Sequence, residues 1–573
     1  MRIAMLTGWL LLCLLSSIGI GHSQEMDDPV FRAMADELER SIDQLVLPDM
    51  AGPYFLGYCI QDVERSITEA RYGALVQTEQ SQDRYLYIDL RVGDPAQDNT
   101  GFVATWRDLH KMRNDLPVVD DYGSLRHHLW LHTDMAYKDA LENLARKQAY
   151  LQAHPSKDEV PDFAAAEPFV YLSDPASLQA DPEQWQTRVR KAALVLRDFP
   201  ALQDWKVTYV GLATTKRYLN SEGFKHLKGG TYQYLTIAAT AQAEDGQRLT
   251  NFLQYIASGD ELPPTDAQLQ EDIRAMADEL KAMVEAPALE EYAGPVLFTG
   301  FGAAQFISQL FVNQLSPTKA PRVAEEWMKQ HLPDAKLAGR LNRRVLPSFV
   351  SITDEPNRMT WDKQVCAGHQ RVDDEGVKCQ DITLVSNGRL VDLPTGRGPT
   401  KKLPHSNGHA RRLPNQWTVP AVTNVVVQAE NPRKDLINEM RALCREFGNE
   451  YGLLVTRLED PDVSHPYRWT EADRDTPRLL TSPVVMYRVY QKDGRVEPVR
   501  GLDFDEVTIR TLRDIAAMGE ETRVTNLRQT TGFQGFRYPV AIITPSILVE
   551  EMEFKEAMVR EPLPLSSNPV FDN

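Results

Sequence analysis

Apolar residues near the start of the chain recur at three- and four-residue spacing, which is the period of a helix with one buried face. Asp28 stands before this stripe as an N-cap, and Pro29 suits the first helical turn. The pattern predicts a helix whose buried face consists of Phe31, Met34, Leu38, Ile42 and Leu45.

Segments of alternating apolar and polar residues follow this helix and predict antiparallel strands of a half-buried sheet. They cover Tyr54–Ile60, Glu69–Gln77, Arg84–Val92, Trp205–Ala213 and Tyr232–Ala241. Between them, the helical period returns over Tyr137–Ala153 and Glu183–Leu196. The first half of the chain is therefore predicted to be a sheet with helices packed against it.

A longer amphipathic helix is predicted over Thr265–Glu285, where Thr265 and Gln268 have the spacing of a capping box and Pro287 follows the end. Beyond it the pattern changes to short apolar runs between Gly, Pro and Asn turns, which predict strands. These runs are Val345–Ile352, Ile382–Val385, Val422–Val427, Pro483–Tyr490 and Val540–Ile543. We expect an α+β fold with two domains, residues 24–288 and a β-rich domain of residues 289–573.

The first 23 residues have the pattern of a signal peptide. Arg2 precedes an apolar run, Ile3–Ile20, and the small residues Gly21 and Ser23 suit cleavage before Gln24. The alternative is an uncleaved membrane anchor, because the run is nearly long enough to span a bilayer. No later segment approaches that length, so no transmembrane span is expected after cleavage. The prediction is an exported bacterial protein, periplasmic or secreted.

Composition changes this picture in two ways. A chain of 573 residues exceeds what one hydrophobic core usually supports. Its 81 acidic and 63 basic residues give a net charge of −18, which argues against binding nucleic acid.

Export permits disulfides, so Cys366 and Cys379 could bridge neighbouring strands. The alternative is that Cys59, Cys366, Cys379 and Cys444 are four buried free thiols.

Several short phrases resemble, in order along the chain, those of the TldD/PmbA (TldD/TldE) metallopeptidase family. They are YLNSEG at 218–223, AEDG at 243–246, YAGPVLF at 292–298, SFVSITDEP at 348–356, DDEG at 373–376, SNGRL at 386–390, SNGHAR at 406–411 and PSILVEE at 545–551. The resemblance implies an α+β N-terminal domain and a β-rich C-terminal domain. It also implies dimers that enclose a peptide-accepting cavity, with zinc in a TldD-type subunit and none in a PmbA-type subunit.

The metal ligands of a TldD-type subunit are missing from this chain. In the family, two His and a Glu in the pattern HExxxH lie on the helix after the YAGPVLF strand, and a Cys near the C-terminus completes the site. The corresponding helix here, Gly302–Leu310, contains no His, Glu, Asp or Cys, and Gln529–Phe536 contains no Cys. We therefore expect no zinc at the family position. No G-x-S-x-G, P-loop or catalytic-cysteine signature appears elsewhere.

Two other sets of residues have metal-ligand spacing. Cys366 and His369 form C-x2-H, and His405 and His409 form H-x3-H, which together make a four-ligand set for zinc. Such spacings also arise by chance. His128 and His132, beside His127, share one helical face, and their alternative is simple packing.

A basic, Pro- and Gly-rich stretch, Leu393–Pro414, predicts a long surface loop. At its end, His409, Arg411 and Arg412 join Lys401 and Lys402 in a positive patch for a substrate carboxylate or an acidic partner. The alternative is a solvated loop. The carboxylates of Asp373–Glu375 pose a similar choice between acid-base chemistry and a turn.

Three functions follow from these residues, and whether the chain is an enzyme stays open. The first is a non-catalytic, metal-free subunit in a homodimer or in a heterodimer with a zinc-bearing TldD-type subunit, acting on peptides. The second is a metallopeptidase with a relocated zinc site at Cys366, His369, His405 and His409. The third is an exported peptide-binding module. The acidity and the predicted export argue against modulation of DNA gyrase, which the family's name implies.

Overall fold

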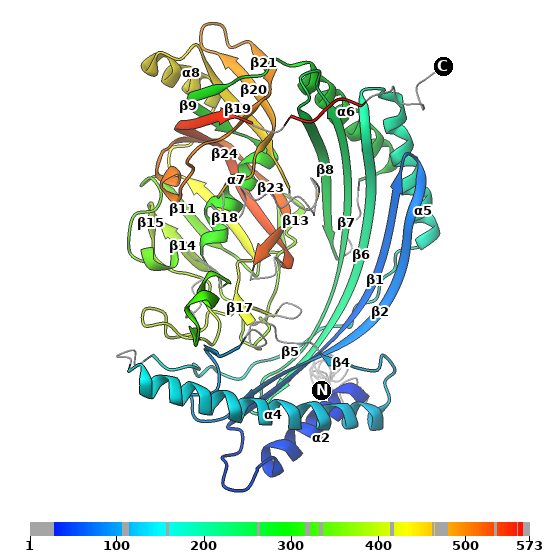
Figure 1. Cartoon of the computed structure of the whole chain (residues 1–573), viewed down its shortest axis with the longest axis vertical. Coiled ribbons are helices and arrows are strands. Elements are labelled where there is room, and N and C mark those ends of the chain that lie inside the picture. The colour runs from blue at the N-terminus through cyan, green and yellow to red at the C-terminus, as the bar shows by residue number, and fades with distance from the viewer. Residues whose placement is uncertain are drawn as a thin grey trace, which may run out of the picture.

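The computed structural model describes residues 28–105, 114–155, 160–259, 264–315, 321–331, 336–412, 418–460, 463, 479–531, 536–557 and 560–564. The predicted signal peptide lies outside these residues. Within them, no helix is both long and apolar enough to cross a membrane. The described residues form two large sheets with associated helices, which confirms the predicted two-domain α+β fold (Figure 1).

The first sheet contains seven strands among the described residues, in the order β4-β2-β1-β6-β7-β5 with β8 paired to β7. Figure 1 shows its long strands curving along one side of the molecule. The strands are β1 (Phe55–Arg71), β2 (Ala74–Arg91), β4 (Asn114–Asp115), β5 (Val170–Leu172), β6 (Leu202–Asn220), β7 (Lys225–Gln242) and β8 (Arg248–Ser258).

The three short strands predicted over 54–92 are in fact two long ones. Tyr72 and Gly73, with φ of 52° and 82°, form a tight hairpin turn inside the predicted strand 69–77. The polar middle of each strand interrupts the alternation without ending the pairing. Asp62 there forms ion pairs with Arg84 on β2 and Arg217 on β6, so charged residues continue the ladder.

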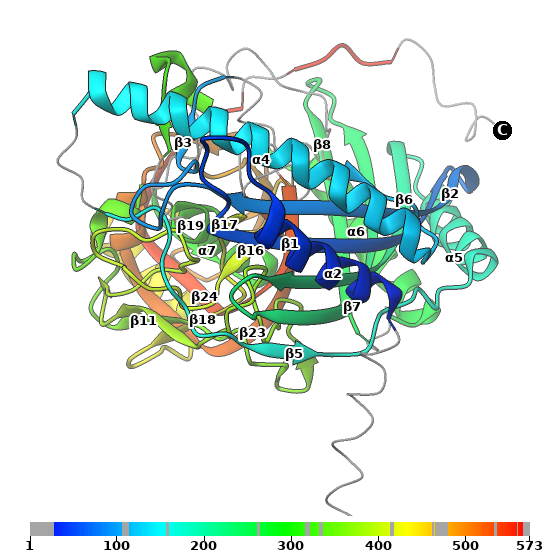
Figure 2. The same ribbon diagram turned by 90° about the horizontal axis from the view of Figure 1, so that it is seen from below.

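Helices cover the ends and one face of this sheet. Helices α2 (Pro29–Gln44) and α4 (Tyr122–Ala153) pack together across its lower end (Figures 1 and 2). Helices α5 (Pro182–Val195) and α6 (Asp266–Glu285) pack on its strands. The predicted N-caps are confirmed, because Asp28 accepts from the Val30 and Phe31 amides and Thr265 accepts from the Gln268 amide. The second half of the predicted capping box is replaced by a bond from the Gln268 side chain to Asp272.

Helix α4 begins at Tyr122 rather than at the predicted Tyr137. Its first turns bury only Leu125, Leu129 and Thr133, one residue per turn, and leave Trp130 and Leu131 exposed. Apolar residues on the exposed side hide the helical period there.

The second sheet contains eleven strands among the described residues, which confirms the β-rich second half. Its main order is β15-β14-β11-β18-β24-β9-β19-β20-β21, with β22 and β23 paired to β24. The strands are β9 (Glu291–Phe298), β11 (Val350–Asp354), β14 (Ile382–Ser386), β15 (Arg389–Leu390), β18 (Asn424–Ala429), β19 (Tyr451–Leu458), β20 (Pro483–Tyr490), β21 (Val496–Val499), β22 (Leu502–Phe504), β23 (Ile515–Thr531) and β24 (Phe536–Glu556).

Two helices and several short pairs complete this half. Helix α7 (Gly300–Leu310) follows β9, and α8 (Leu436–Phe447) precedes β19. The small sheets pair β3 (Phe102–Val103) with β10 (Arg322–Val323), β12 (Thr360–Trp361) with β13 (Gln364–Val365), and β16 (Ala410–Arg412) with β17 (Thr418–Pro420).

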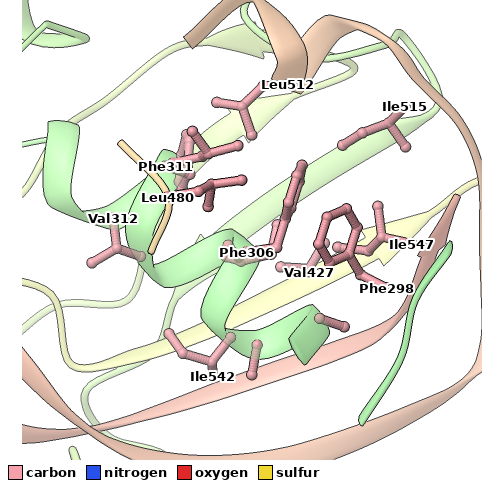
Figure 3. Packing of buried hydrophobic residues seen from close by; sticks show 14 of the residues in the cluster. Phe298, Phe306, Phe311, Val312, Val427, Leu480, Leu512, Ile515, Ile542 and Ile547 are labelled. Atoms are coloured by element: carbon pink, nitrogen blue, oxygen red, sulfur yellow. The ribbon is translucent and has the colours of Figure 1, made fainter. Parts of the chain in front are cut away.

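The largest apolar cluster of the described residues lies around α7. Phe306 and Phe311 pack between the helix and the sheet, together with Phe298, Ile542 and Ile547, and all five are fully buried (Figure 3). Helix α7 is thus enclosed by the sheet and its neighbouring segments, which fixes the place of every side chain that it carries.

The prediction that Leu393–Pro414 is a surface loop is wrong for the two ends of its described part, whereas Lys401 and Lys402 between them are exposed. Leu393, Arg397 and Ala410 are almost completely buried. The Arg397 guanidinium forms a two-pronged ion pair with Glu222 in the β6–β7 turn and donates to the carbonyl of Ala164. It also stacks on Phe163 at 3.8 Å. Basic composition indicated exposure, but partners from the first sheet allow the charge to be buried.

The two sheets meet at a buried ion-pair cluster. Asp374, 2% exposed, lies between Lys216 on β6 at 2.9 Å and Lys228 on β7 at 2.6 Å, and it accepts from the Arg412 amide at 2.8 Å. Burial alone would raise the pKa of Asp374, but the two lysines hold it well below its usual range. Burial lowers the pKa of Lys216 in spite of this carboxylate. The cluster therefore ties the β-hairpin of the first sheet to the second domain.

Asp374→Asn is expected to lower the free energy of unfolding by about 3 kcal/mol, because it leaves two largely buried ammonium groups without their counter-charge. The measurement is chemical denaturation followed by tryptophan fluorescence. Glu430→Gln, which removes an exposed carboxylate from the second domain, is the matched control and should change stability by less than about 0.5 kcal/mol. Equal stability of the two variants would show that the cluster does not hold the domains.

Candidate functional site

Helix α7 is the element on which a metal site would depend, and its polar side chains are all engaged. Gln305 is buried against β19, where its amide donates to the Leu458 carbonyl at 2.9 Å and accepts from the Leu458 amide at 2.7 Å. Gln309 makes the same kind of double contact with Thr481. These bonds attach the helix to neighbouring strands and loops.

Ser308 connects α7 to the C-terminal region. Its hydroxyl donates to Gln529 Oε1 on β23 at 2.6 Å, and the Gln529 amide in turn donates to Asn313. Both Ser308 and Gln529 are buried. The two segments that the family resemblance pairs around zinc thus meet in this structure through a hydroxyl and two neutral amides.

These residues do not fit a zinc ion. Protein zinc sites use thiolate, imidazole or carboxylate ligands, and the groups here are neutral amides and a hydroxyl bonded to one another. Within the described residues, no three His, Cys, Asp or Glu side chains gather in an arrangement that could hold a metal.

The predicted four-residue zinc set is dispersed accordingly, since no three of its members come together. Cys366 packs in an apolar cluster with Val426, Ala541 and Ile543. His409 is fully buried beside Asp354, 3.5 Å from its carboxylate, and its Nδ1 contacts Asn407. Burial, and then Arg371, lower the pKa of His369. His405 contributes its carbonyl, which accepts from Thr395.

The predicted positive patch does not form as a surface. His409 and Arg412 are buried, whereas Lys401 and Lys402 are exposed. Arg411 is half-buried over the ring of Tyr538, and Arg412 lies over the ring of Tyr218. Arg412 thus reaches the first domain, His409 is enclosed in the second, and the two lysines face solvent, so a ligand from solvent does not meet all of them together.

His128 and His132 do share one face of α4, with ring centroids 6.4 Å apart. His128 Nδ1 lies 2.8 Å from the Ser124 carbonyl within the same helix. Burial, and then His128, lower the pKa of His132. The described residues add no third ligand to this pair, and the simpler interpretation of a packed helix face describes it.

The DDEG segment is a buried turn. Asp373 Oδ1 accepts from the amides of Glu375 and Val377, and Gly376 has a φ of 87°. Burial, and then the Glu375 carboxylate, raise the pKa of Asp373 to about 8. Both carboxylates are buried, and Asp373 holds the turn by accepting backbone hydrogen bonds, so neither offers an acid-base group to a substrate.

The four cysteines of the described residues are buried, and no disulfide joins Cys366 to Cys379. Burial raises the pKa of the Cys379 thiol above its usual range, and the Asp373 carboxylate adds to this rise. A thiol of raised pKa is a poor nucleophile at neutral pH, so Cys379 is not activated as a catalytic group.

An open pocket lies between the two domains beside the first turn of α7. We call it the β8–α6 pocket. Its volume is about 440 Å³, and its walls come from β8, α6, Phe301 of α7 and Arg457 of β19. Sequence reasoning missed it, together with Lys216, Lys228 and Arg397, because each depends on contacts between residues far apart in the chain. The only local signal was the run of basic residues on the alternating strands β6 and β7.

Gln305→Leu is expected to lower the free energy of unfolding by about 2 kcal/mol, because it leaves the amide and carbonyl of Leu458 buried without partners. Thermal or chemical denaturation measures the change. Gln270→Leu on the exposed side of α6 is the control, with an expected change under about 0.5 kcal/mol. Full stability of Gln305→Leu would mean that this contact does not secure α7.

Comparison with known proteins agrees with this architecture. Residues 292–556 match the family model of the PmbA/TldA metallopeptidase C-terminal domain. No curated protein matches the chain. Among solved structures, TldE from Thermococcus kodakarensis is similar with a TM-score of 0.57 at 13% identity, covering 91% of this chain and 100% of TldE.

Two further structures are described as candidate modulators of DNA gyrase. The protein from Thermotoga maritima gives a TM-score of 0.55 at 14% identity, over 87% of this chain and 96% of its own. The protein from Bacteroides thetaiotaomicron gives 0.55 at 12% identity, over 91% and 98%. At these identities the structures share the fold, and the family model identifies the C-terminal domain. Residues 292–556 of this chain therefore belong to the TldD/PmbA family of metallopeptidase-related proteins through their C-terminal domain, and the chain shares the fold of these structures.

Proposed function

We propose that this chain is a metal-free, non-catalytic subunit of an exported peptide-processing assembly, in which a zinc-bearing TldD-type subunit is its partner. The observation that carries the proposal is the contact of Ser308 on α7 with Gln529 on β23 at 2.6 Å. It joins the two segments that would supply ligands in a catalytic subunit, and it does so with neutral groups.

The state of α7 supports the same proposal. Acquiring a zinc ligand at Gln305, Ser308 or Gln309 would require breaking buried hydrogen bonds to Leu458, Gln529 or Thr481. Each broken bond leaves a buried polar group unpaired, which costs about 1–3 kcal/mol. The helix is therefore built as a structural element, while the fold that surrounds it is kept.

Export is the second part of the proposal. It rests on the apolar run Ile3–Ile20 and the small residues Gly21 and Ser23. A net charge of −18 also disfavours nucleic acid as the ligand.

Reconstitution tests the proposed function. The mature chain is mixed with a zinc-bearing TldD-type subunit from the same genome, and complex formation and peptide hydrolysis are measured for each protein alone and together. We expect the chain alone to be inactive, and the mixture to form a stable complex with altered hydrolysis. Chelator-sensitive peptide hydrolysis by the chain alone would contradict the proposal.

A self-sufficient peptide-binding module is the second candidate. The β8–α6 pocket favours it, because a volume of about 440 Å³ is enough for a small ligand without any partner subunit. Peptides that co-purify with the chain, together with no complex in the reconstitution, would select this candidate.

A further inference from the structure

The β8–α6 pocket lies at the junction of the two domains, which is a preferred position for ligand sites. Strand β8 and helix α6 supply Phe252, Gln254, Asp272 and Met276 from the first domain. Phe301 and Arg457 close it from the second domain. Its volume of about 440 Å³ falls within the range of roughly 300–1,000 Å³ that holds small organic ligands.

One part of the pocket is apolar. Phe252 and Phe301 meet edge to face, with ring centroids 5.8 Å apart and an interplanar angle of 81°. Met276 on α6 lines the same pocket. Such a surface suits an aliphatic stem. The Arg457 guanidinium already lies over the Phe252 ring, 5.5 Å from its centroid, so a ligand cation must be received elsewhere in the pocket.

The charges of the pocket do not balance. Arg457 is paired with Glu279, with 3.0 Å between Nη1 and Oε2, so these two charges offset each other. Asp272 accepts only from neutral donors, the Tyr255 hydroxyl at 2.6 Å and the Gln268 amide at 2.9 Å. Within the described part of the chain it makes no ion pair, which leaves one uncompensated negative charge in the pocket.

A second acceptor is also unused. The Oε1 atom of Gln254 is buried and has no hydrogen-bond partner among the described residues. A buried acceptor without a partner carries a cost that a ligand donor would remove. The pocket thus combines an uncompensated carboxylate, an unused amide oxygen and an apolar surface. Together these favour a ligand with a cationic donor group on an apolar stem.

We propose that the β8–α6 pocket binds the lysine or arginine side chain of a peptide. The aliphatic stem lies against Phe252, Phe301 and Met276, and the cationic group pairs with Asp272. The peptide as carrier rests on the proposed function, whereas the preference for a cation rests on the pocket alone. A free alkylamine shares the same chemistry and is distinguished in the test.

Isothermal titration calorimetry on the mature full-length chain tests this proposal. The probes are the dipeptides Lys-Leu and Glu-Leu, and n-pentylamine, all at low ionic strength. Lys-Leu is expected to bind more tightly than either of the others. Asp272→Asn should weaken Lys-Leu binding by roughly tenfold, because it removes the charge but keeps an oxygen for Tyr255.

Asp278→Asn provides the matched control, since Asp278 lies on the same helix but is exposed and outside the pocket. It should leave the affinity unchanged. If Asp272→Asn does not fold, Gln254→Leu serves in its place and should also weaken binding.

Equal affinity for Lys-Leu and Glu-Leu, no binding of any probe, or equal losses in the Asp272 and Asp278 variants would each overturn the proposal. Binding of n-pentylamine without Lys-Leu would overturn the peptide assignment. If these titrations fail, the result of the reconstitution still stands. If the chain binds the cation but forms no complex, the assignment of the pocket still stands. The two failures are therefore distinguishable.

Discussion

Helix α7 is enclosed on nearly all sides, so each polar group that it carries must find a partner inside the protein. This constraint determines much of the second domain. Gln305 attaches the helix to β19, Ser308 attaches it to β23, and Gln309 attaches it to the segment before β20. Side-chain hydrogen bonds and the aromatic packing of Phe306 and Phe311 together hold the helix in this enclosed position.

The second constraint is the burial of charge between the domains. Asp374 and Glu222 come from different domains, and each meets basic side chains of the other: Asp374 meets Lys216 and Lys228, and Glu222 meets Arg397. A buried charge is tolerated only when it is paired, so the relative position of the two sheets is specified closely. That fixed position also gives the β8–α6 pocket walls from both domains.

Local patterns were enough to predict α5, α6 and β20 to within a residue or two, because each helix keeps one face buried and β20 is a short apolar run followed by polar turn residues. They failed where charges pair across strands. The polar stretch around Asp62 was not predicted as part of a strand. The ion pairs of Asp62 with side chains on β2 and β6 keep β1 paired there. Composition failed in the same way at Arg397, which is buried although its loop is basic, because Glu222 and Phe163 receive the guanidinium.

The candidate site, too, could be predicted from the sequence only in part. The absence of metal-ligand residues from Gly302–Leu310 could be read directly from the sequence. The contacts that replace them could not, because Ser308 and Gln529 are 221 residues apart and ordinary in type. The pocket was hidden for the same reason, since Asp272 and Phe301 belong to helices whose patterns describe only their own buried faces.

We infer that α7 and β23 are joined by neutral hydrogen bonds rather than through a metal. Metal content measures this most directly, by mass spectrometry on the mature chain purified without chelator or metal-affinity resin and then equilibrated with zinc and dialysed. Zinc far below one atom per chain is expected. One zinc per chain that survives dialysis, and that is lost on substitution of Ser308 or Gln529, would contradict it.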